Sequence, residues 1–317
     1  MRSPKPLPPS FSDPFLAADA LQAGLTAGRL RASDLRIPSR GIRVPRLSGD
    51  AGDAGDLASR ARPYLDLLPD AVLSHTTAAR LHGMPLPPSY RNESVLHLTR
   101  PSVSADTTRR QVRCHRRKLG TSDVVRPVPG IRVTSPARTF TDLAGILPLQ
   151  DLVVVGDWLV SEHERSYGRV RRAVVPMETL QGYVSGLRWV PHIRTVRRAV
   201  ELVRVGVDSP PETLLRLLLH DAGLPEFRPN LPLLDSTGRP VVWIDLGCPE
   251  YRTSVEYDGA HHLTREQQLR DHNRDLLVSE LGWHQVKISA DDMRRGNHWV
   301  AGKVARGLRL GGWAAGG

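Results

Sequence analysis

The feature that most constrains the fold is the regular punctuation of residues 209–289 by caps and turns. A helix is predicted in SPPETLLRLLLHDAG, where Ser209 is the N-cap, prolines fill the first turn and Gly223 ends the helix. Three antiparallel strands are predicted in FRPNLPLL, VVWIDLG and YRTSVEYDG, which the turns DSTG and CPE separate. A helix at 264–282 and the strand WHQVKIS come next, so the predicted order is α-β-β-β-α-β.

Alternation along the second and third strands predicts an apolar face and an acidic face. The apolar face takes Ile244, Leu246, Val255 and Tyr257, and the inner stripe of the second helix takes Leu269, Leu276, Leu277 and Leu281. Asp245 then lies on the same side as Glu256 and Asp258, and Glu212 of the preceding helix can approach them. Crowded carboxylates raise one another's pKa unless a cation neutralises them, and a hard divalent ion such as Mg²⁺ is the simplest candidate.

Each acidic residue also has an ordinary structural role. Glu212 stands where a Ser-x-x-Glu capping box takes a glutamate, Asp245 lies near a turn and Asp258 ends a strand. The other polar residues nearby are typical of a surface: His261, His262, and the helical ion pair Asp271 and Arg274. The apolar neighbours of Asp245 and Glu256 nevertheless place both acids inside packed strands.

Positive charge is concentrated in the first two thirds of the chain. Residues 1–204 carry 31 Lys and Arg against 18 Asp and Glu, whereas residues 205–317 carry 13 against 15. Such a basic region is typical of a protein that contacts the phosphate backbone of DNA. Because 40 of the 44 basic residues are arginine, biased composition with charges spread over solvated faces is the alternative explanation.

Two segments of the basic region are candidates for nucleic-acid contact. In 1–47, two short helices around Gly24, with Thr26 as a cap and Leu30 inward, precede the strand RGIRVP and predict a winged helix-turn-helix. In RRQVRCHRRK, alternation turns Val112 and Cys114 inward. Arg113, His115 and Arg117 then face outward and could track phosphates, or they could protect a solvated edge strand from pairing.

The predicted domain organisation has four parts. They are a winged-helix segment at 1–47, a basic α+β and helical region at 59–204, a unit at 205–300, and a C-terminal tail at 301–317. The fold class is therefore mixed α/β. Cys114 and Cys248 are too few and too far apart for a disulfide framework or a zinc-ligand cluster, and no apolar run is long enough to span a membrane, so we expect a cytoplasmic location.

Three C-terminal segments, SPPETLLRLLLHDAGLPEF, VVWIDLGCPEYRTSVEYDGAHH and RDHNRDLLVSELGWHQVKISADD, together resemble a known domain. It is an actinobacterial domain of unknown function related to very-short-patch-repair endonucleases, within the PD-(D/E)XK restriction-endonuclease-like fold. The basic region resembles, more weakly, the winged-helix region of AbiEi-type antitoxins, in GLTAGRL, RGIRV, LSHTTAARLHGMPLP and TSPARTFTDLA.

The resemblance implies metal-dependent hydrolysis of phosphodiester bonds in DNA. By residue, it implies that Asp245 and Glu256 hold Mg²⁺ or Mn²⁺ and that Glu212 completes the site or orients a metal-bound water. It also implies that His262 acts as a general base or proton shuttle, with Asp258 and Asp271 in support and Arg274 either in support or in contact with a phosphate. One departure is clear, because the Glu-x-Lys pattern of restriction endonucleases is here Glu256-Tyr257-Asp258. Lys287 on the last strand, or His261 or His262, would have to replace that lysine.

Two functional hypotheses of different classes result. The first is a Mg²⁺-dependent DNA endonuclease of repair or defence, in which the basic region docks on DNA. The second is a non-enzymatic DNA-binding regulator, or a type IV antitoxin-like protein, with a degenerate nuclease domain. A protein whose arginines bind an acidic protein is a third hypothesis, based on charge alone, and the sequence does not identify a toxin or a self-association partner.

Overall fold

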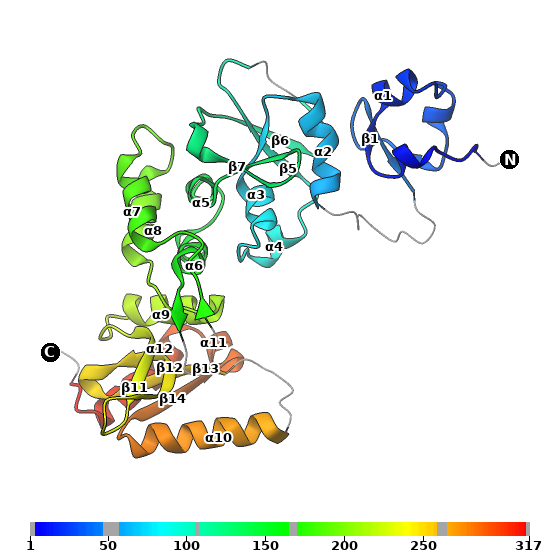
Figure 1. The fold of residues 1–317 in the computed structure, drawn as a ribbon. Helices are drawn as coiled ribbons and strands as arrows, with labels where there is room; N and C mark the ends of the chain where they lie inside the picture. The colour runs from blue at the N-terminus through cyan, green and yellow to red at the C-terminus, as the bar shows by residue number, and fades with distance from the viewer. Residues whose placement is uncertain (1–3, 47–56, 105–107, 165–169, 259–264, 315–317) are drawn as a thin grey trace. The chain divides into compact units, whose positions relative to one another are not determined.

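The chain folds as a mixed α/β protein in which runs of strands and runs of helices follow one another. A computed structural model describes residues 4–46, 57–104, 108–164, 170–258 and 265–314 (Figure 1). These residues form two compact units, Met1–Ile146 and Leu147–Gly317. No helix of the described residues is both long enough and apolar enough to cross a lipid bilayer.

The first unit begins with a small three-stranded antiparallel sheet of order β1-β3-β2. Its elements are β1 (Phe15–Leu16), α1 (Ala17–Gln22), the 3-10 turn η2 (Arg29–Arg31), β2 (Leu35–Arg36) and β3 (Ile42–Pro45). Leu30 is buried as predicted, but the N-cap of the second turn is Gly28 and not Thr26, although Thr26 Oγ1 accepts a hydrogen bond from Arg29 N at 3.2 Å. That turn is a single 3-10 turn, however, and not a second α-helix.

The rest of the first unit is a five-stranded mixed sheet of order β6-β5-β4-β8-β7, covered by helices. Its elements are α2 (Leu57–Leu67), β4 (Val72–Leu73), α3 (His75–Leu81), α4 (Pro88–Arg91), β5 (Leu96–Arg100), β6 (Val112–Arg116), β7 (Val124–Val128), β8 (Ile131–Thr134) and α5 (Pro136–Leu143). The predicted start of α5 is confirmed, because Ser135 Oγ accepts a hydrogen bond from Arg138 N. Among the described strands, β6 pairs only with β5 and therefore lies at the edge of the sheet.

The second unit opens with helices that the sequence assigned to the preceding region. They are α6 (Leu149–Val160), α7 (Met177–Gly186) and α8 (Ile193–Leu202), together with the short strands β9 (His163–Glu164) and β10 (Val170–Arg171). Asp157 of α6 forms a buried ion pair with Arg216 at 2.7 Å. The division after Ile146 therefore differs from the predicted boundary at 204/205, because this helical layer packs with the C-terminal helices and strands.

The order α-β-β-β-α-β predicted for residues 209–289 is present. It consists of α9 (Pro210–Asp221), β11 (Arg228–Leu234), β12 (Pro240–Cys248), β13 (Thr253–Asp258), α10 (Arg265–Glu280) and β14 (His284–Ser289). The strands form one sheet of order β11-β12-β13-β14, with β14 parallel to β13 and the other neighbours antiparallel. Helix α10 covers one face of this sheet, and α9 with α12 (Asn297–Leu310) covers the other (Figure 1).

Packing corrects three details of the sequence analysis. Ile244 packs with Val278 of α10, whereas Leu246 belongs to the core under α9 and α12, so strict alternation along β12 does not hold. On the part of α10 whose side chains the structure describes, which excludes the predicted Leu269, Leu276 is exposed and Val278 is fully buried. The segment 301–317 was predicted to be a tail, but α12 continues through it to Leu310 and buries Val304 and Leu308.

Candidate functional site

The strands β12 and β13 bring the carboxylates of Asp245 and Glu256 together. The backbone N–H of Asp245 donates to Glu256 Oε1 at 3.4 Å, and the backbone N–H of Tyr257 donates to Asp245 Oδ2 at 3.2 Å. The regular backbone pairing of β12 with β13 ends at Leu246 and Val255. Beyond this point, the side chain of Asp245 accepts the hydrogen bond from the β13 backbone. The two acids that the sequence proposed as metal ligands are neighbours in space.

A guanidinium group from α10 supplies the positive charge next to these acids. Arg274 binds Glu256 in a bidentate manner, with Nη1 to Oε2 at 2.7 Å and Nη2 to Oε1 at 2.9 Å. Its Nη2 also lies 3.7 Å from Asp245 Oδ1 and donates to the backbone carbonyl of Trp243 at 2.6 Å. Helix α10 therefore contributes one cation to a pair of anions, as the planar fork of an arginine allows.

The electrostatic balance at this site depends on whether Glu256 is ionised. Burial raises the pKa of Glu256, the charge of Asp245 raises it further, and Arg274 lowers it. The same two carboxylates raise the pKa of Arg274 against the effect of its own burial. With both acids ionised, the three side chains carry a net charge of −1.

The donor set fits a hard divalent cation in chemistry, because carboxylate oxygens are the ligands that Mg²⁺ prefers. Arg274 now contacts the same oxygens, so it would have to share them with such an ion or withdraw. Among the described residues, the acids do not form a group of three whose ligand oxygens all lie within 4.8 Å of one another.

Glu212 binds the start of its own helix but does not complete the predicted capping box, because Ser209 forms no side-chain cap hydrogen bond with a helix N–H group. Its Oε1 accepts a hydrogen bond from Ser209 Oγ at 2.6 Å, and its Oε2 accepts one from the backbone N–H of Asp208 at 3.0 Å. Burial raises the pKa of Glu212 to about 7, and the next largest cause is the charge of Asp245. Glu212 is thus electrostatically linked to the carboxylate pair while its oxygens serve the helix end.

The remaining candidates of this region have varied positions. Lys287 pairs in register with Glu256 on the adjacent parallel strand. Its Nζ, however, forms its ion pair with Asp275 of α10 and not with Asp245 or Glu256. Asp258 is exposed at the end of β13. His261 and His262 lie outside the described residues, and so does the side chain of Asp271, so their predicted roles stay predictions.

The basic strand β6 keeps part of its predicted pattern. Arg113 and Arg117 are exposed, and Arg117 Nη1 donates to the carbonyl of Arg116 at 2.8 Å. The prediction that His115 faces outward with them is wrong, because its ring stacks on His75 at a centroid separation of 3.6 Å. The face of β6 that carries these residues is therefore partly covered by the start of α3.

Sequence reasoning missed the histidines that meet at this point. His75, His97 and His115 lie on three separate segments, and one ring nitrogen of each lies within 4.8 Å of the others. The histidines could have been found only from the parallel pairing of LHLTR with VRCHR, which places His97 and His115 on one face of the sheet. A single sequence does not reveal which strands pair, so the histidines did not stand out.

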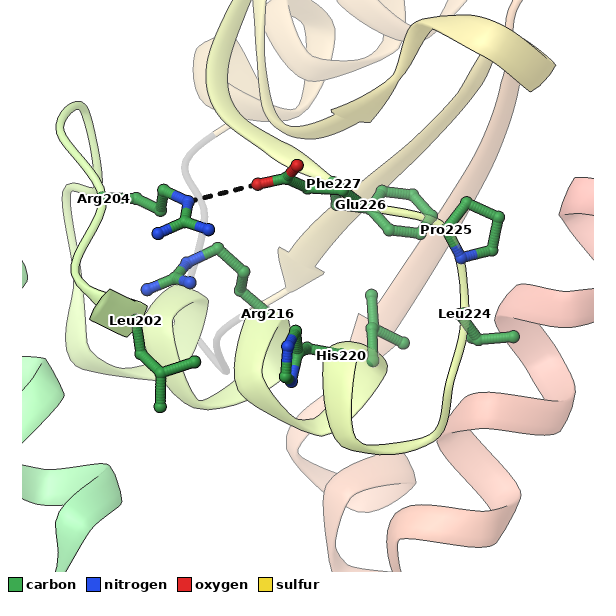
Figure 2. A pocket seen from close by; sticks show the side chains of 9 residues that line it. Leu202, Arg204, Arg216, His220, Leu224, Pro225, Glu226 and Phe227 are labelled. Carbon is green, nitrogen blue, oxygen red and sulfur yellow. Dashed lines mark hydrogen bonds and ion pairs between the residues drawn. The ribbon is translucent and has the colours of Figure 1, made fainter. Parts of the chain in front are cut away.

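The sequence also missed the buried anchor between α6 and α9. Asp157 accepts hydrogen bonds from Thr213 Oγ1, Arg216 Nη2 and the backbone N–H of Arg204, at 2.8, 2.7 and 2.7 Å. Beside this anchor lies a small open pocket of about 210 Å³ (Figure 2). The pocket is lined by Leu202, Arg204, Arg216, Leu219, His220, Leu224, Pro225, Glu226 and Phe227. Glu226 pairs with Arg204 at 3.2 Å, so the pocket is not a free cationic site.

Comparison with known proteins gives relatives of no stated activity. The chain is 27% identical over 240 residues to "Uncharacterized protein MT2308" of Mycobacterium tuberculosis strain CDC 1551 / Oshkosh and, equally, to "Uncharacterized protein Rv2248" of strain ATCC 25618 / H37Rv. Each alignment covers 75% of this chain and 81% of the relative. No family model matches the chain, and no solved structure matches it.

Proposed function

We propose that the C-terminal unit is a divalent-metal-dependent nuclease that hydrolyses phosphodiester bonds in DNA. The observation that carries the proposal is the meeting of Asp245 and Glu256, from adjacent strands, around the shared cation Arg274. Two largely buried carboxylates with one arginine are short of positive charge, and a pair of oxygen-donor side chains is what a hard divalent cation takes.

Asp245 and Glu256 are the residues that would hold the ion. A bound Mg²⁺ or Mn²⁺ would polarise the phosphate and lower the pKa of a coordinated water. A bound dication would favour the ionised form of Glu256, and with both acids ionised the net charge of the site would change from −1 to +1, which favours the approach of an anionic phosphodiester.

The chain's own residues then have defined roles. A guanidinium group donates two parallel hydrogen bonds to a phosphate as readily as to a carboxylate, so Arg274 can transfer from Glu256 to the substrate. With its pKa raised to about 7, Glu212 is partly protonated at neutral pH and can hold a proton close to Asp245. His262 remains the proposed general base on the strength of the family resemblance.

DNA is the proposed substrate because of the regional charge. Residues 1–204 have an excess of 13 positive charges, and the proposed winged helix and the exposed Arg113 and Arg117 lie in this part of the chain. A basic surface of this kind binds the phosphate backbone without regard to sequence.

A second candidate function is DNA binding without cleavage, as in a regulator or antitoxin-like protein. It is favoured by Arg274, which already binds both oxygens of Glu256, and by Lys287, which pairs with Asp275. In that case the carboxylates and Arg274 are a structural ion pair, and the fold serves as a binding module.

The two candidates are separated by a cleavage assay on the full chain. Supercoiled plasmid, single-stranded DNA and mismatched duplex are incubated with Mg²⁺, Mn²⁺ or EDTA, with the wild type and with Asp245→Asn and Glu256→Gln. Glu280→Gln, an exposed substitution on α10, is the matched control. DNA binding is measured for every protein by fluorescence anisotropy.

The nuclease proposal expects cutting that needs the metal, that both site substitutions abolish and that Glu280→Gln retains. Equal background cutting by the wild type and both site variants, with DNA binding intact in all, would assign the protein to the non-enzymatic class instead.

A further inference from the structure

We propose that His75, His97 and His115 form a binding site for a transition-metal dication, with Zn²⁺ as the best match. This triad lies in the first unit, and the proposal is independent of the carboxylates of the second unit. Each histidine comes from a different element, namely the start of α3, β5 and β6.

The fold brings the triad together through strand register and helix packing. Strands β5 and β6 pair in parallel, with His97 opposite Arg113 and Thr99 opposite His115, so the two histidines share one face as diagonal neighbours. Helix α3 packs on β5, and its first residue is His75. Residues 75, 97 and 115 thus converge from segments about twenty positions apart.

The distances suit shared coordination. His97 Nδ1 lies 3.0 Å from His115 Nε2, and tetrahedral Zn²⁺ with nitrogen ligands at about 2.0–2.1 Å places them roughly 3.3 Å apart. One nitrogen of each of the three rings lies within 4.8 Å of the other two. The rings of His75 and His115 are stacked with an interplanar angle of 17°, so one of them has to tilt to aim its nitrogen at a common ion.

The outer nitrogens are held by other side chains, as in the second shell of known metal sites. Ser74 Oγ lies 2.9 Å from His75 Nδ1 and accepts a hydrogen bond from Thr99 Oγ1 at 2.8 Å. Glu93 Oε1 lies 3.4 Å from His97 Nε2. These contacts leave His75 Nε2 and His97 Nδ1 for an ion, next to His115 Nε2.

Burial keeps the three rings in the form that binds metals. His75 and His97 are buried, and His115 is half-buried. Burial is the largest cause that lowers the pKa of each of the three rings, and it therefore favours the neutral imidazole over the charged form. A neutral imidazole is the metal ligand, and an ion would displace the proton shared by His97 Nδ1 and His115 Nε2 to another ring nitrogen.

The backbone at His75 adds a separate observation. Its φ of 50° lies in the left-handed region, which is unfavourable for a residue with a side chain. Backbone strain of this kind occurs preferentially at functional sites. Here it sets the start of α3 so that the imidazole points to the other two histidines.

The chemistry of the donors selects the class of ion. Three imidazoles suit Zn²⁺, Co²⁺, Ni²⁺ or Cu²⁺, whereas Mg²⁺ prefers oxygen, so this site and the carboxylate site take different metals. The charges of Arg117 and Arg138 also lower the pKa of His75, and they would weaken the binding of a cation. They would equally favour an anion, such as phosphate or hydroxide, in the open fourth position.

The first test is metal binding by the full chain after treatment with a chelator. In buffer with millimolar Mg²⁺, which keeps the proposed carboxylate site occupied, we expect one Zn²⁺ per chain by isothermal titration calorimetry and visible absorption by bound Co²⁺ of the intensity typical of four-coordination. His115→Gln should bind at least about tenfold more weakly, while His298→Gln, an exposed substitution on α12, and Asp245→Asn should bind as the wild type does.

A second measurement does not depend on the folding of a variant. X-ray absorption of the Zn²⁺-loaded wild type should show imidazole nitrogens at about 2.0 Å. No binding of Zn²⁺ or Co²⁺ by the wild type, affinity unchanged in a folded His115→Gln, or a first shell of oxygen alone would each overturn the proposal. Asp245→Asn removes a carboxylate of the proposed nuclease site. If this variant binds Zn²⁺ as the wild type does, the histidine site is independent of the nuclease proposal and can be tested even if that proposal fails.

Discussion

Removal of Arg274 is the sharpest test of how the carboxylate pair is stabilised. The substitution Arg274→Met keeps an unbranched apolar stem and removes the guanidinium group with its charge. Glu256, with a side chain 7% exposed, and Asp245, at 25%, are then left facing each other without the cation. The carbonyl of Trp243 loses its donor as well.

The size of the effect is set by burial. Breaking a fully buried ion pair by removing one partner costs about 3–5 kcal/mol. The Arg274 side chain is 34% exposed, so water can replace part of what it supplies, and we expect a loss of about 2–3 kcal/mol at pH 8. A matched control is Arg306→Met, an exposed position on α12, which should change stability by no more than about 0.5 kcal/mol.

The loss should depend on pH in one direction. Without Arg274, the pKa of Glu256 in the folded state is raised further above its value in the unfolded chain. A carboxyl group of this kind is most favourable to folding when protonated, and stability falls as the pH rises from the unfolded pKa to the folded one. The difference between wild type and Arg274→Met should therefore shrink from pH 8 to pH 5.

Urea unfolding followed by tryptophan fluorescence measures this stability. All six tryptophans lie between Trp158 and Trp313, so the signal reports only the second unit. Adding Glu256→Gln to Arg274→Met should recover at least about 1 kcal/mol, because the charge that lacked a partner is gone. Millimolar Mg²⁺ should stabilise Arg274→Met more than the wild type, since nothing then competes for the oxygens.

Arg274→Met and wild type with equal stability at pH 8, or a loss that Glu256→Gln leaves unchanged, would refute the electrostatic account of this site. A loss that is rescued by Glu256→Gln but not by Mg²⁺ would support the structural ion pair and count against the metal.

Three further predictions concern other parts of the chain. Burial, with the charge of Asp245, raises the pKa of Glu212 to about 7, so the free energy of unfolding should fall as the pH rises from 5 to 8. The substitution Glu212→Gln should remove about 2 kcal/mol of that fall, measured by urea titrations at the two pH values. The substitution Asp157→Ala leaves Arg216 buried without its partner and should cost about 3–5 kcal/mol by tryptophan fluorescence, and a loss below about 1 kcal/mol would contradict the anchoring of α6 to α9. Replacing Arg113 and Arg117 with glutamine should weaken the salt dependence of DNA binding. The slope of log K against log salt should fall in magnitude by about one unit for each phosphate that the variant no longer neutralises. An unchanged slope would remove β6 from the proposed DNA surface.

Local signals in the sequence were sufficient for the order of the elements. Ser209 and Gly223 delimit α9, and Ser135 with Pro136 begins α5, because caps and turn residues act within a few positions of the backbone they stabilise. The three antiparallel strands could be predicted from their turns in the same way. The meeting of Asp245 with Glu256 could also be predicted, since both lie on consecutive strands of one meander.

Only the tertiary structure decided which groups neutralise or contact one another. Arg274 was proposed as a supporting residue, but its bidentate contact with Glu256 depends on how α10 lies on the sheet. Lys287 is in register with Glu256 and is nevertheless held by Asp275. The histidine triad, the continuation of α12 and the split of Ile244 from Leu246 depend on the pairing of distant segments, which a single chain's local pattern does not specify.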